Sequence, residues 1–446
     1  MGTRHTTEAD VIVIGGGIAG LGAALRLKDR GLEPLVLEAD SRVGGRMTTD
    51  RANGFVIDRG VTLLGKGFKR MRAMVKRFGL SPLACSSNFS VAIEGPAGPR
   101  GYRGVHFEDL LLDPGLSWRD RLAALRFGLD LVWHSRALAH GRSDLSGPLD
   151  DEDSFTYFQR IGAAEVFRCV FEPGLNGPVG GSAAASSRVI AMQTIWNLLV
   201  RGQWNLADGV DRIPESIGAQ VRVVTNARVI SVERHANEVQ VEVQISSARQ
   251  TLHARGVVFA LPGHLVPGLC PSLPEEIREL LARTRYSKMV NAAVALSSPP
   301  ASPHAGYAFR QEVVSGAAIE LEHLRVPHRC PQGAGMAGVY LWDTPQLRRL
   351  DGDDEAIKKQ ASEIVERTFP ECRGKVLFVH LVKWNIAIAQ FPPGRLREMT
   401  ALRNRLAAWN APFDLCGDYL DGISSEGALH TGEQAGGRLA NKLVKP

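Results

Sequence analysis

Residues 10–46 read DVIVIGGGIAGLGAALRLKDRGLEPLVLEADSRVGGR, and the fold class follows from this stretch. Asp10 to Ile14 is an apolar run that is too short for a helix, so it predicts a buried strand. Ala19 to Lys28 is rich in Ala, Leu and Arg and predicts a helix. Pro34 to Leu37 is apolar again and predicts a second strand. This order of elements indicates an α/β fold built on a parallel sheet.

Three glycines fill the turn between the first strand and the helix, at Gly15, Gly17 and Gly20. In the spacing G-x-G-x-x-G, the first permits a tight turn, the second lets a pyrophosphate approach the backbone, and the third lets the helix pack closely. The helix N-terminus offers free N–H groups to that pyrophosphate. Glu38 ends the second strand, where a carboxylate bonds a ribose hydroxyl. The stretch therefore predicts a dinucleotide site.

The run Arg42-Val43-Gly44-Gly45-Arg46 comes next. Such an R-x-G-G-R run resembles the flavin-binding families of monoamine oxidase, polyamine oxidase, protoporphyrinogen oxidase and phytoene desaturase. The resemblance implies that the paired glycines and the arginine lie along the pyrophosphate of FAD. We therefore assign Arg42, Gly44, Gly45 and Arg46 to a cofactor site.

Further motifs of these families follow in the same order. Gly54–Gly60 is similar to their G-F-x-x-D-x-G strand, and Val257–Pro262 is similar to their V-I-x-A-x-P strand. Asn226–Val232 resembles their N-x-x-V-x-x-I segment, which implies that the backbone of Val229 contacts adenine.

A second flavin motif lies near the end of the sequence. Leu415–Asp418 and Gly422–Ala428 resemble the family's G-[DE] followed by a helix that starts near E-G-A. The resemblance implies that Gly417 and Asp418 approach the ribityl chain. It also implies that a helix beginning near Ile423 points its N-terminus at the flavin ring, where its dipole stabilises the anionic reduced form.

The expected architecture is a Rossmann-type FAD-binding domain interleaved with an α+β substrate-binding domain. The composition and the expected secondary structure change several times along the sequence, so we expect the chain to alternate between the two domains. The FAD-binding domain is predicted at residues 8–80, 205–284 and 396–446, and the substrate-binding domain at residues 81–204, which are largely helical, and 285–395.

Composition agrees with an enzyme of ordinary size. The chain has 446 residues, 44% of them hydrophobic, and a net charge of +6 without a clustered basic stripe, which argues against nucleic-acid binding. Six cysteines have no paired spacing, so no metal site or disulfide framework is indicated. Met1–Ala9 lacks an apolar segment, and no apolar run approaches the ~20 residues of a membrane span. We expect a cytoplasmic protein.

The middle of the chain resembles protoporphyrinogen oxidase most closely. Asp153–Gly174 is similar to that family's helical stretch, and Trp384–Gly394 (WNIAIAQFPPG) to its W-x-x-A-[IL]-P-Q-[YF]-x-x-G motif, in which Ala389 replaces a proline. Tyr286–Val290 is similar to the Y-T-K-I/V strand of polyamine and amino-acid oxidases. That similarity implies that Lys288 faces inward, holds a water beside the flavin N5 atom and assists reoxidation by oxygen.

Two absences refine the expected chemistry. Amine oxidases hold the substrate nitrogen between two aromatic rings, and the corresponding positions fall near Ala387 and at Ser424 or Ser425, which are not aromatic. The position of the flavin-linking cysteine falls near Ile386, which has no nucleophile, so FAD is expected to bind noncovalently.

These features predict an FAD-dependent oxidoreductase that removes a hydride from a hydrophobic, polycyclic or polyene-like substrate, with oxygen as acceptor. One alternative is an amine or amino-acid oxidase with an altered aromatic cage. Another is a non-catalytic lipid carrier of the Rab GDP-dissociation inhibitor fold.

Two of the predicted helices suggest further roles that we weigh against simple packing. Trp118–Leu138 reads as a long amphipathic helix that carries Arg121 and Arg126. Relatives with lipid-like substrates dock on membranes through such helices, but a packed core helix is favoured here. Glu426 and His430 are spaced to pair on the last helix, where packing is favoured over catalysis.

Overall fold

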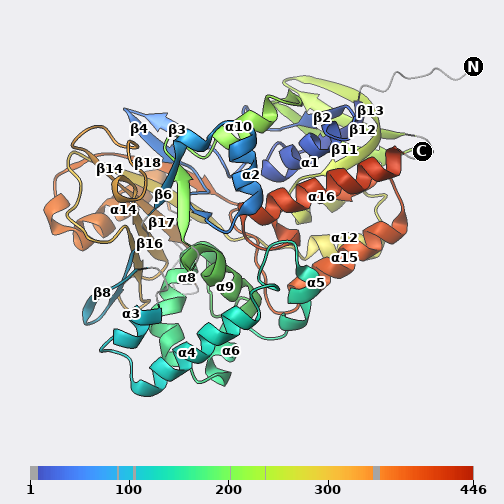
Figure 1. Ribbon diagram of the computed structural model, residues 1–446. Coiled ribbons are helices and arrows are strands. Elements are labelled where there is room, and N and C mark those ends of the chain that lie inside the picture. The colour runs from blue at the N-terminus through green and yellow to red at the C-terminus, as the bar shows by residue number, and fades with distance from the viewer. Residues whose placement is uncertain are drawn as a thin grey trace, which may run out of the picture.

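The computed structural model describes residues 9–87, 90–103, 107–200, 202–236, 238–344 and 352–444. Most of Met1–Ala9 lies outside these ranges. Figure 1 shows two sheets on opposite sides of the molecule and a helical lobe below them. The expected mixture of a parallel α/β sheet with a second α+β unit is confirmed.

The first sheet contains the predicted dinucleotide-binding strands. Its central strands β1 (Ala9–Ile14), β2 (Pro34–Leu37) and β13 (Ala248–Phe259) run parallel, and Val11 pairs with Pro34 on one side and with Gly256 on the other. The strand order is β10 (Arg222–Val224), β2 (Pro34–Leu37), β1 (Ala9–Ile14), β13 (Ala248–Phe259), β12 (Val239–Ile245) and β11 (Ala227–Arg234), with β19 (Phe413–Leu415) also on β13.

Two helices from opposite ends of the chain cover one face of this sheet side by side (Figure 1). They are α1 (Ile18–Lys28) and α16 (Ser425–Leu443). Gly432 permits the contact, because a Cβ on this residue would lie 2.0 Å from the carbonyl oxygen of Ala19. The first and last segments of the chain therefore form one packed unit. The neighbouring helices are α2 (Lys69–Arg77), α10 (Arg212–Gly218), α11 (Val266–Leu269), α12 (Glu275–Ala282) and α15 (Arg395–Trp409).

The second sheet is built mainly from the later part of the chain and takes two strands from before the helical lobe. Its order is β18 (Val376–Trp384), β14 (Met289–Leu296), β17 (Gly335–Trp342), β16 (Ala317–Leu321), β15 (Gly306–Phe309), β7 (Val91–Gly95) and β8 (Gly98–Tyr102). Helix α14 (Asp354–Thr368) packs Ile357, Ala361 and Val365 into the core of this sheet. Smaller elements join the two sheets: β3 (Thr49–Ala52) with β4 (Phe55–Asp58), β9 (Gln203–Leu206) between β5 (Leu64–Gly65) and β6 (Ala84–Ser87), and α13 (Glu322–Arg325).

The helical lobe contains two π-helical segments, at Phe167–Phe171 and Ile195–Val200. Such segments are rare in proteins, but those that occur are often found at functional sites. The lobe's α-helices are α3 (Phe107–Leu112), α4 (Trp118–Trp133), α5 (Ser143–Ser146), α6 (Ser154–Arg160), α7 (Ala164–Val166), α8 (Glu172–Val179) and α9 (Arg188–Thr194).

Helix α4 is shorter than predicted and is packed on only one face. It ends at Trp133, and its buried residues are Ala123, Ala124, Phe127 and Leu131. The prediction of a packed core helix is therefore wrong for its outer face, which carries large exposed apolar side chains. None of the helices in the described ranges is both long enough and apolar enough to cross a membrane.

Candidate active site

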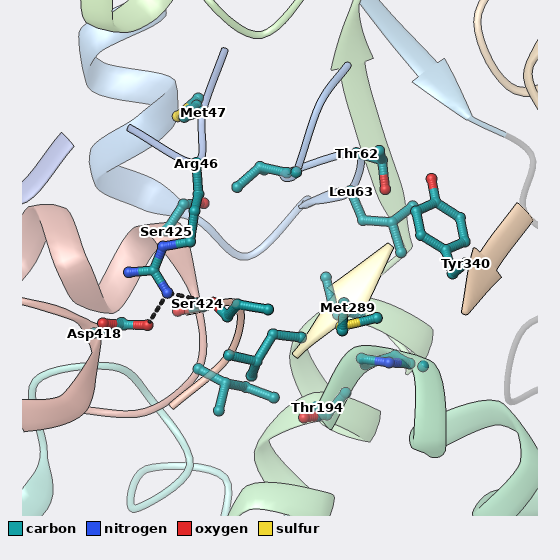
Figure 2. Close-up of a pocket in the computed structure, with 18 of the residues that line it drawn as sticks. Arg46, Met47, Thr62, Leu63, Thr194, Met289, Tyr340, Asp418, Ser424 and Ser425 are labelled. Atoms are coloured by element: carbon teal, nitrogen blue, oxygen red, sulfur yellow. Dashed lines mark hydrogen bonds and ion pairs between the residues drawn. The ribbon is translucent and has the colours of Figure 1, made fainter. Parts of the chain in front are cut away.

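One cavity of about 580 Å³ is lined by the first sheet's glycine turn, the second sheet and the helical lobe. Figure 2 shows Met289 and Tyr340 of the second sheet, Thr194 of the helical lobe and Arg46 and Ser424 from the other side of the cavity. The structure brings most of the residues that the sequence assigned to the cofactor to this one cavity: Gly15, Gly17, Glu38, Gly44, Gly45, Arg46, Gly417, Asp418 and Ile423.

The glycine turn has the shape that a pyrophosphate site requires. Gly15 has φ +108°, a conformation that side chains rarely allow. A Cβ on Gly20 would lie 1.9 Å from the Gly15 carbonyl oxygen, so this glycine lets α1 approach β1. A Cβ on Gly17 would meet nothing within 4 Å, and no side chain caps the helix there. The N-terminus of α1 is thus open to an anionic group.

Glu38 is fixed at the end of β2 by the turn itself. Its carboxylate accepts hydrogen bonds from the backbone N–H of Gly16 at 2.6 Å and of Asp40 at 2.8 Å. These bonds hold the side chain at the cavity wall, one residue beyond the strand. This geometry fits a carboxylate that receives ribose hydroxyls.

The R-x-G-G-R run lies directly against the glycine turn. Gly44 donates to the carbonyl oxygen of Gly16 at 2.8 Å and forms a parallel bridge with Gly17. Gly45 lies close enough that a Cβ on it would be 3.4 Å from the Gly17 Cα. The two glycine segments therefore line the same part of the cavity.

Arg46 and Asp418 close this end of the site with an ion pair. Arg46 Nη1 lies 2.8 Å from Asp418 Oδ2. Figure 2 marks this ion pair with a dashed line. Burial lowers the pKa of Arg46, but Asp418 more than offsets this and the pKa is raised. Burial and the Asp418 carboxylate raise the pKa of Tyr286, whose hydroxyl donates to Asp418 Oδ1 at 3.3 Å. The guanidinium therefore stays charged in the cavity.

The N-terminus of α16 opens onto the cavity beside Ile423. Ser424 is its N-cap, with Oγ accepting from Gly427 N at 3.0 Å. The same Oγ lies 3.0 Å from His140 Nε2. Burial, His430 and nearby positive charge lower the pKa of His140 to about 4, so this imidazole is neutral at physiological pH.

Three assigned residues lie outside the cavity lining. Gly20 acts in helix packing, as described above. Arg42 pairs with Asp50 at 2.7 Å instead of facing the cavity. Val229 is buried in β11 beside a bulge, and its predicted contact with adenine stays a prediction.

The inward orientation predicted for Lys288 is wrong. Its side chain is exposed and does not line the cavity, whereas the next residue, Met289, does. Strand β14 begins only at Met289, so Lys288 precedes the buried strand and turns its ammonium group to solvent. The prediction was wrong because the apolar strand that follows Lys288 begins one residue later, at Met289.

Two buried amide side chains line the cavity and were not predicted from the sequence. Asn291 donates through Nδ2 to the Asp58 carbonyl oxygen at 2.8 Å, and its Oδ1 has no partner among the described residues. Gln203 is 1% exposed, and neither of its amide atoms has a partner within those ranges. A signal was present for Asn291, since it is the one polar residue in the apolar strand MVNAAVAL.

The second sheet adds a carboxyl group to the wall. Glu320 lines the cavity, accepts from the Tyr340 hydroxyl at 2.8 Å and pairs with buried Arg325. Burial raises the pKa of Glu320, and the nearby Glu322 adds to this effect. Around these groups the wall is largely apolar, with Val91, Ile93, Val170, Phe171, Pro173 and Ala308.

Comparison with known proteins decides the family. The model of the family described as flavin containing amine oxidoreductase matches residues 18–440. The chain belongs to this family. It is an oxidoreductase with a flavin cofactor, so the predictions of the superfamily and of FAD are confirmed. The alternative of a non-catalytic lipid carrier is set aside.

Similar proteins in the family are named for different substrates. A coproporphyrinogen III oxidase of Bacillus subtilis is 23% identical over 95% of this chain and 96% of its own. A putative flavin-containing monoamine oxidase of Mycobacterium tuberculosis is 28% identical over 70% of each chain.

Two solved structures share the fold. A putative protoporphyrinogen oxidase of Exiguobacterium has a TM-score of 0.78 at 15% identity, covering 98% of this chain and 99% of its own. Cyclohexylamine oxidase of Brevibacterium oxydans has a TM-score of 0.76 at 18% identity, covering 98% and 100%.

Proposed function

We propose that this flavin-containing oxidoreductase binds FAD noncovalently and removes a hydride from an apolar, ring-containing substrate. The observation that carries the proposal is the absence of aromatic side chains at Ala387, Ser424 and Ser425, all of which line the cavity. A small primary amine would therefore find no aromatic ring at these three positions. The apolar wall formed with Phe171 supplies contact area for a larger molecule instead.

FAD binding would rest on groups from three segments of the chain. The α1 N-terminus and the glycines facing it would receive the pyrophosphate, Glu38 the ribose, and Asp418 the ribityl chain. Ile386 lines the cavity where the family's linking cysteine is expected and offers no nucleophile. Denaturation should therefore release free flavin into solution, and flavin that stays with precipitated protein would contradict this part of the proposal.

When bound, the flavin supplies the acceptor for the substrate hydride. The chain's own groups then have to orient the substrate. Asn291 is anchored through Nδ2 to the backbone of Asp58, so its unpartnered Oδ1 is fixed and suited to accept a substrate N–H. Gln203 offers a second buried donor and acceptor. Lys288 lies in solvent and does not support oxygen as the acceptor, so we propose only the reductive half-reaction.

A second candidate function rests on Glu320. The Glu320 carboxyl group, which already pairs with Arg325 and accepts from Tyr340, would receive the ammonium group of a cyclic amine as a further partner. The resemblance in fold to a cyclohexylamine oxidase is in keeping with this alternative, in which Glu320 would replace the aromatic cage.

An anaerobic bleaching screen tests both functions. Flavin absorbance is followed as the holoprotein is mixed with partly reduced tetrapyrroles, apolar cyclic amines, benzylamine or putrescine. We expect bleaching by ring systems with an oxidisable C–C or ring C–N bond and none by the two primary amines. Rapid bleaching by benzylamine or putrescine would overturn the main proposal.

Two variants locate the substrate in the cavity. Asn291→Leu should raise the substrate concentration for half-maximal bleaching about tenfold with unchanged flavin content, because it removes a buried hydrogen-bonding group. Lys288→Met, which changes an exposed residue nearby in sequence, is the matched control and should behave as wild type. Glu320→Gln should abolish amine bleaching only if the second candidate is correct.

A further inference from the structure

The part of the cavity wall where an aromatic ring is missing carries a serine beside a histidine. The sequence places one ring of the amine oxidase cage at Ser424 or Ser425, and the Ser424 hydroxyl lies 3.0 Å from His140 Nε2. Both Ser424 and His140 line the cavity. Figure 2 shows Ser424 on the opposite side of the cavity from Met289 and Tyr340. A hydroxyl group next to an imidazole therefore stands in place of the ring.

The His140 imidazole is held in position by its surroundings. The next residue, Gly141, has φ +86°, a conformation that side chains rarely allow. Its backbone N–H donates to Asp421 Oδ2 at 2.7 Å, which ties this loop of the helical lobe to the turn before α16. The Phe68 ring packs edge-on against the imidazole, with 5.6 Å between the ring centroids. These contacts fix the imidazole relative to the Ser424 hydroxyl.

The hydrogen bonds around Ser424 leave its hydroxyl oxygen with one unused lone pair. A neutral imidazole has one N–H and one acceptor nitrogen. His140 bonds the backbone of Asp421, and this bond acts to raise the pKa of His140, so the ring is its donor. The nitrogen that faces Ser424 is then the acceptor, and the Ser424 O–H points at it. Because Ser424 Oγ also accepts from the Gly427 N–H at 3.0 Å, one lone pair remains for a ligand.

This part of the wall is suited to an uncharged ligand group. Burial, above all, lowers the pKa of His140 to about 4, so the imidazole carries no charge at neutral pH. Asp421 and Glu426, which flank Ser424 in sequence, do not line the cavity. An ammonium group at Ser424 would therefore leave water without gaining a compensating negative charge, which is unfavourable.

We propose that the Ser424 hydroxyl, held by His140, accepts a hydrogen bond from an uncharged N–H or O–H group of the substrate. His140 is a positioning residue in this arrangement, because it acts through Ser424. The inference rests on the proposed function, since it places the substrate in the same cavity. It adds the substrate class: an apolar ring system that carries a neutral donor group instead of an ammonium group.

Binding of isosteric probes to the holoprotein tests the inference without turnover. Indole carries a ring N–H, indene has a methylene group in its place, and 2-aminoindane carries an ammonium group. Changes in the visible absorption of the flavin during titration give the dissociation constants. Wild type should bind indole about threefold to tenfold more tightly than indene, which corresponds to one neutral hydrogen bond. His140→Leu and Ser424→Ala should abolish this preference and leave the affinity for indene within about twofold of wild type.

A conservative variant separates positioning from a merely structural role. His140→Gln keeps an acceptor for the Ser424 O–H and should keep the preference for indole, whereas leucine offers no acceptor. Ser424→Ala also removes the N-cap of α16, so the two His140 variants carry the test if the alanine variant does not fold. His235→Leu changes an exposed histidine elsewhere and should bind all three probes as wild type.

Several results would overturn the inference. It fails if wild type does not prefer indole, if His235→Leu loses the preference equally, or if the preference persists in His140→Leu and is lost only in Asn291→Leu. It also fails if 2-aminoindane binds more tightly than indole and His140→Leu weakens that binding, since the wall would then receive an ammonium group. Rapid bleaching by benzylamine would overturn the proposed function instead, and the probe affinities distinguish the two failures because they need no turnover.

Discussion

Arg46 Nη1 and Asp418 Oδ2 lie 2.8 Å apart although 372 residues separate them in sequence. The pair joins the loop after β2 to the turn before α16, and both residues line the cavity. It therefore fixes the positions of two predicted flavin-binding segments relative to each other.

We expect Arg46→Met to weaken FAD binding about tenfold to a hundredfold, the value of a charge-assisted hydrogen bond of about 1.5–3 kcal/mol. The guanidinium is charged, lines the cavity and pairs there with Asp418. Titration of the apoprotein with FAD, followed by flavin fluorescence, measures the effect. Arg42→Met makes the same charge change outside the cavity, and an equal loss there would assign the effect to net charge.

Glu38→Ala should weaken FAD binding by about 1.5–3 kcal/mol, because the carboxylate held by the Gly16 and Asp40 N–H groups is lost. The same titration gives the dissociation constant. Asp40→Ala, two residues further on and exposed, serves as control. An unchanged constant for Glu38→Ala would remove this residue from the binding site.

Lys288→Met should leave both half-reactions within about twofold of wild type, since an exposed ammonium group is screened by solvent and lies outside the cavity. Stopped-flow measurement of anaerobic reduction and of reoxidation by oxygen separates the two steps. A tenfold slower reoxidation would show that the side chain reaches the flavin after all.

His430 should make folding sensitive to acid. Burial, together with Arg70, Arg403 and Arg438, lowers its pKa from 6.5 to about 4. Between these two values the unfolded chain binds the extra proton, so the free energy of unfolding falls as the pH is lowered through this window. Urea unfolding of the holoprotein at several pH values should show a smaller loss for His430→Gln than for wild type. Parallel pH profiles for the two proteins would contradict this explanation.

Much of this protein was determined by local sequence. The run from Asp10 to Leu37 specified strand, turn, helix and strand, because backbone preferences and the glycine spacing act over short distances. Glu38 and the Gly44–Gly45 pair could be assigned to the same site for that reason. The absence of aromatic side chains at Ala387 and Ser424 could also be predicted, since it depends only on which side chain occupies a motif position.

Other features were decided only by tertiary packing. Lys288 and Met289 are neighbours in sequence, and the point at which β14 enters its sheet alone places one in solvent and the other at the cavity. Asn291 and Gln203 meet the same cavity because strands from distant segments converge there. Apolar residues lie on both faces of α4, so the prediction of an amphipathic helix did not show which face packs against the protein. The lobe covers only the face of Phe127, because a helix at the edge of a domain has neighbours on one side.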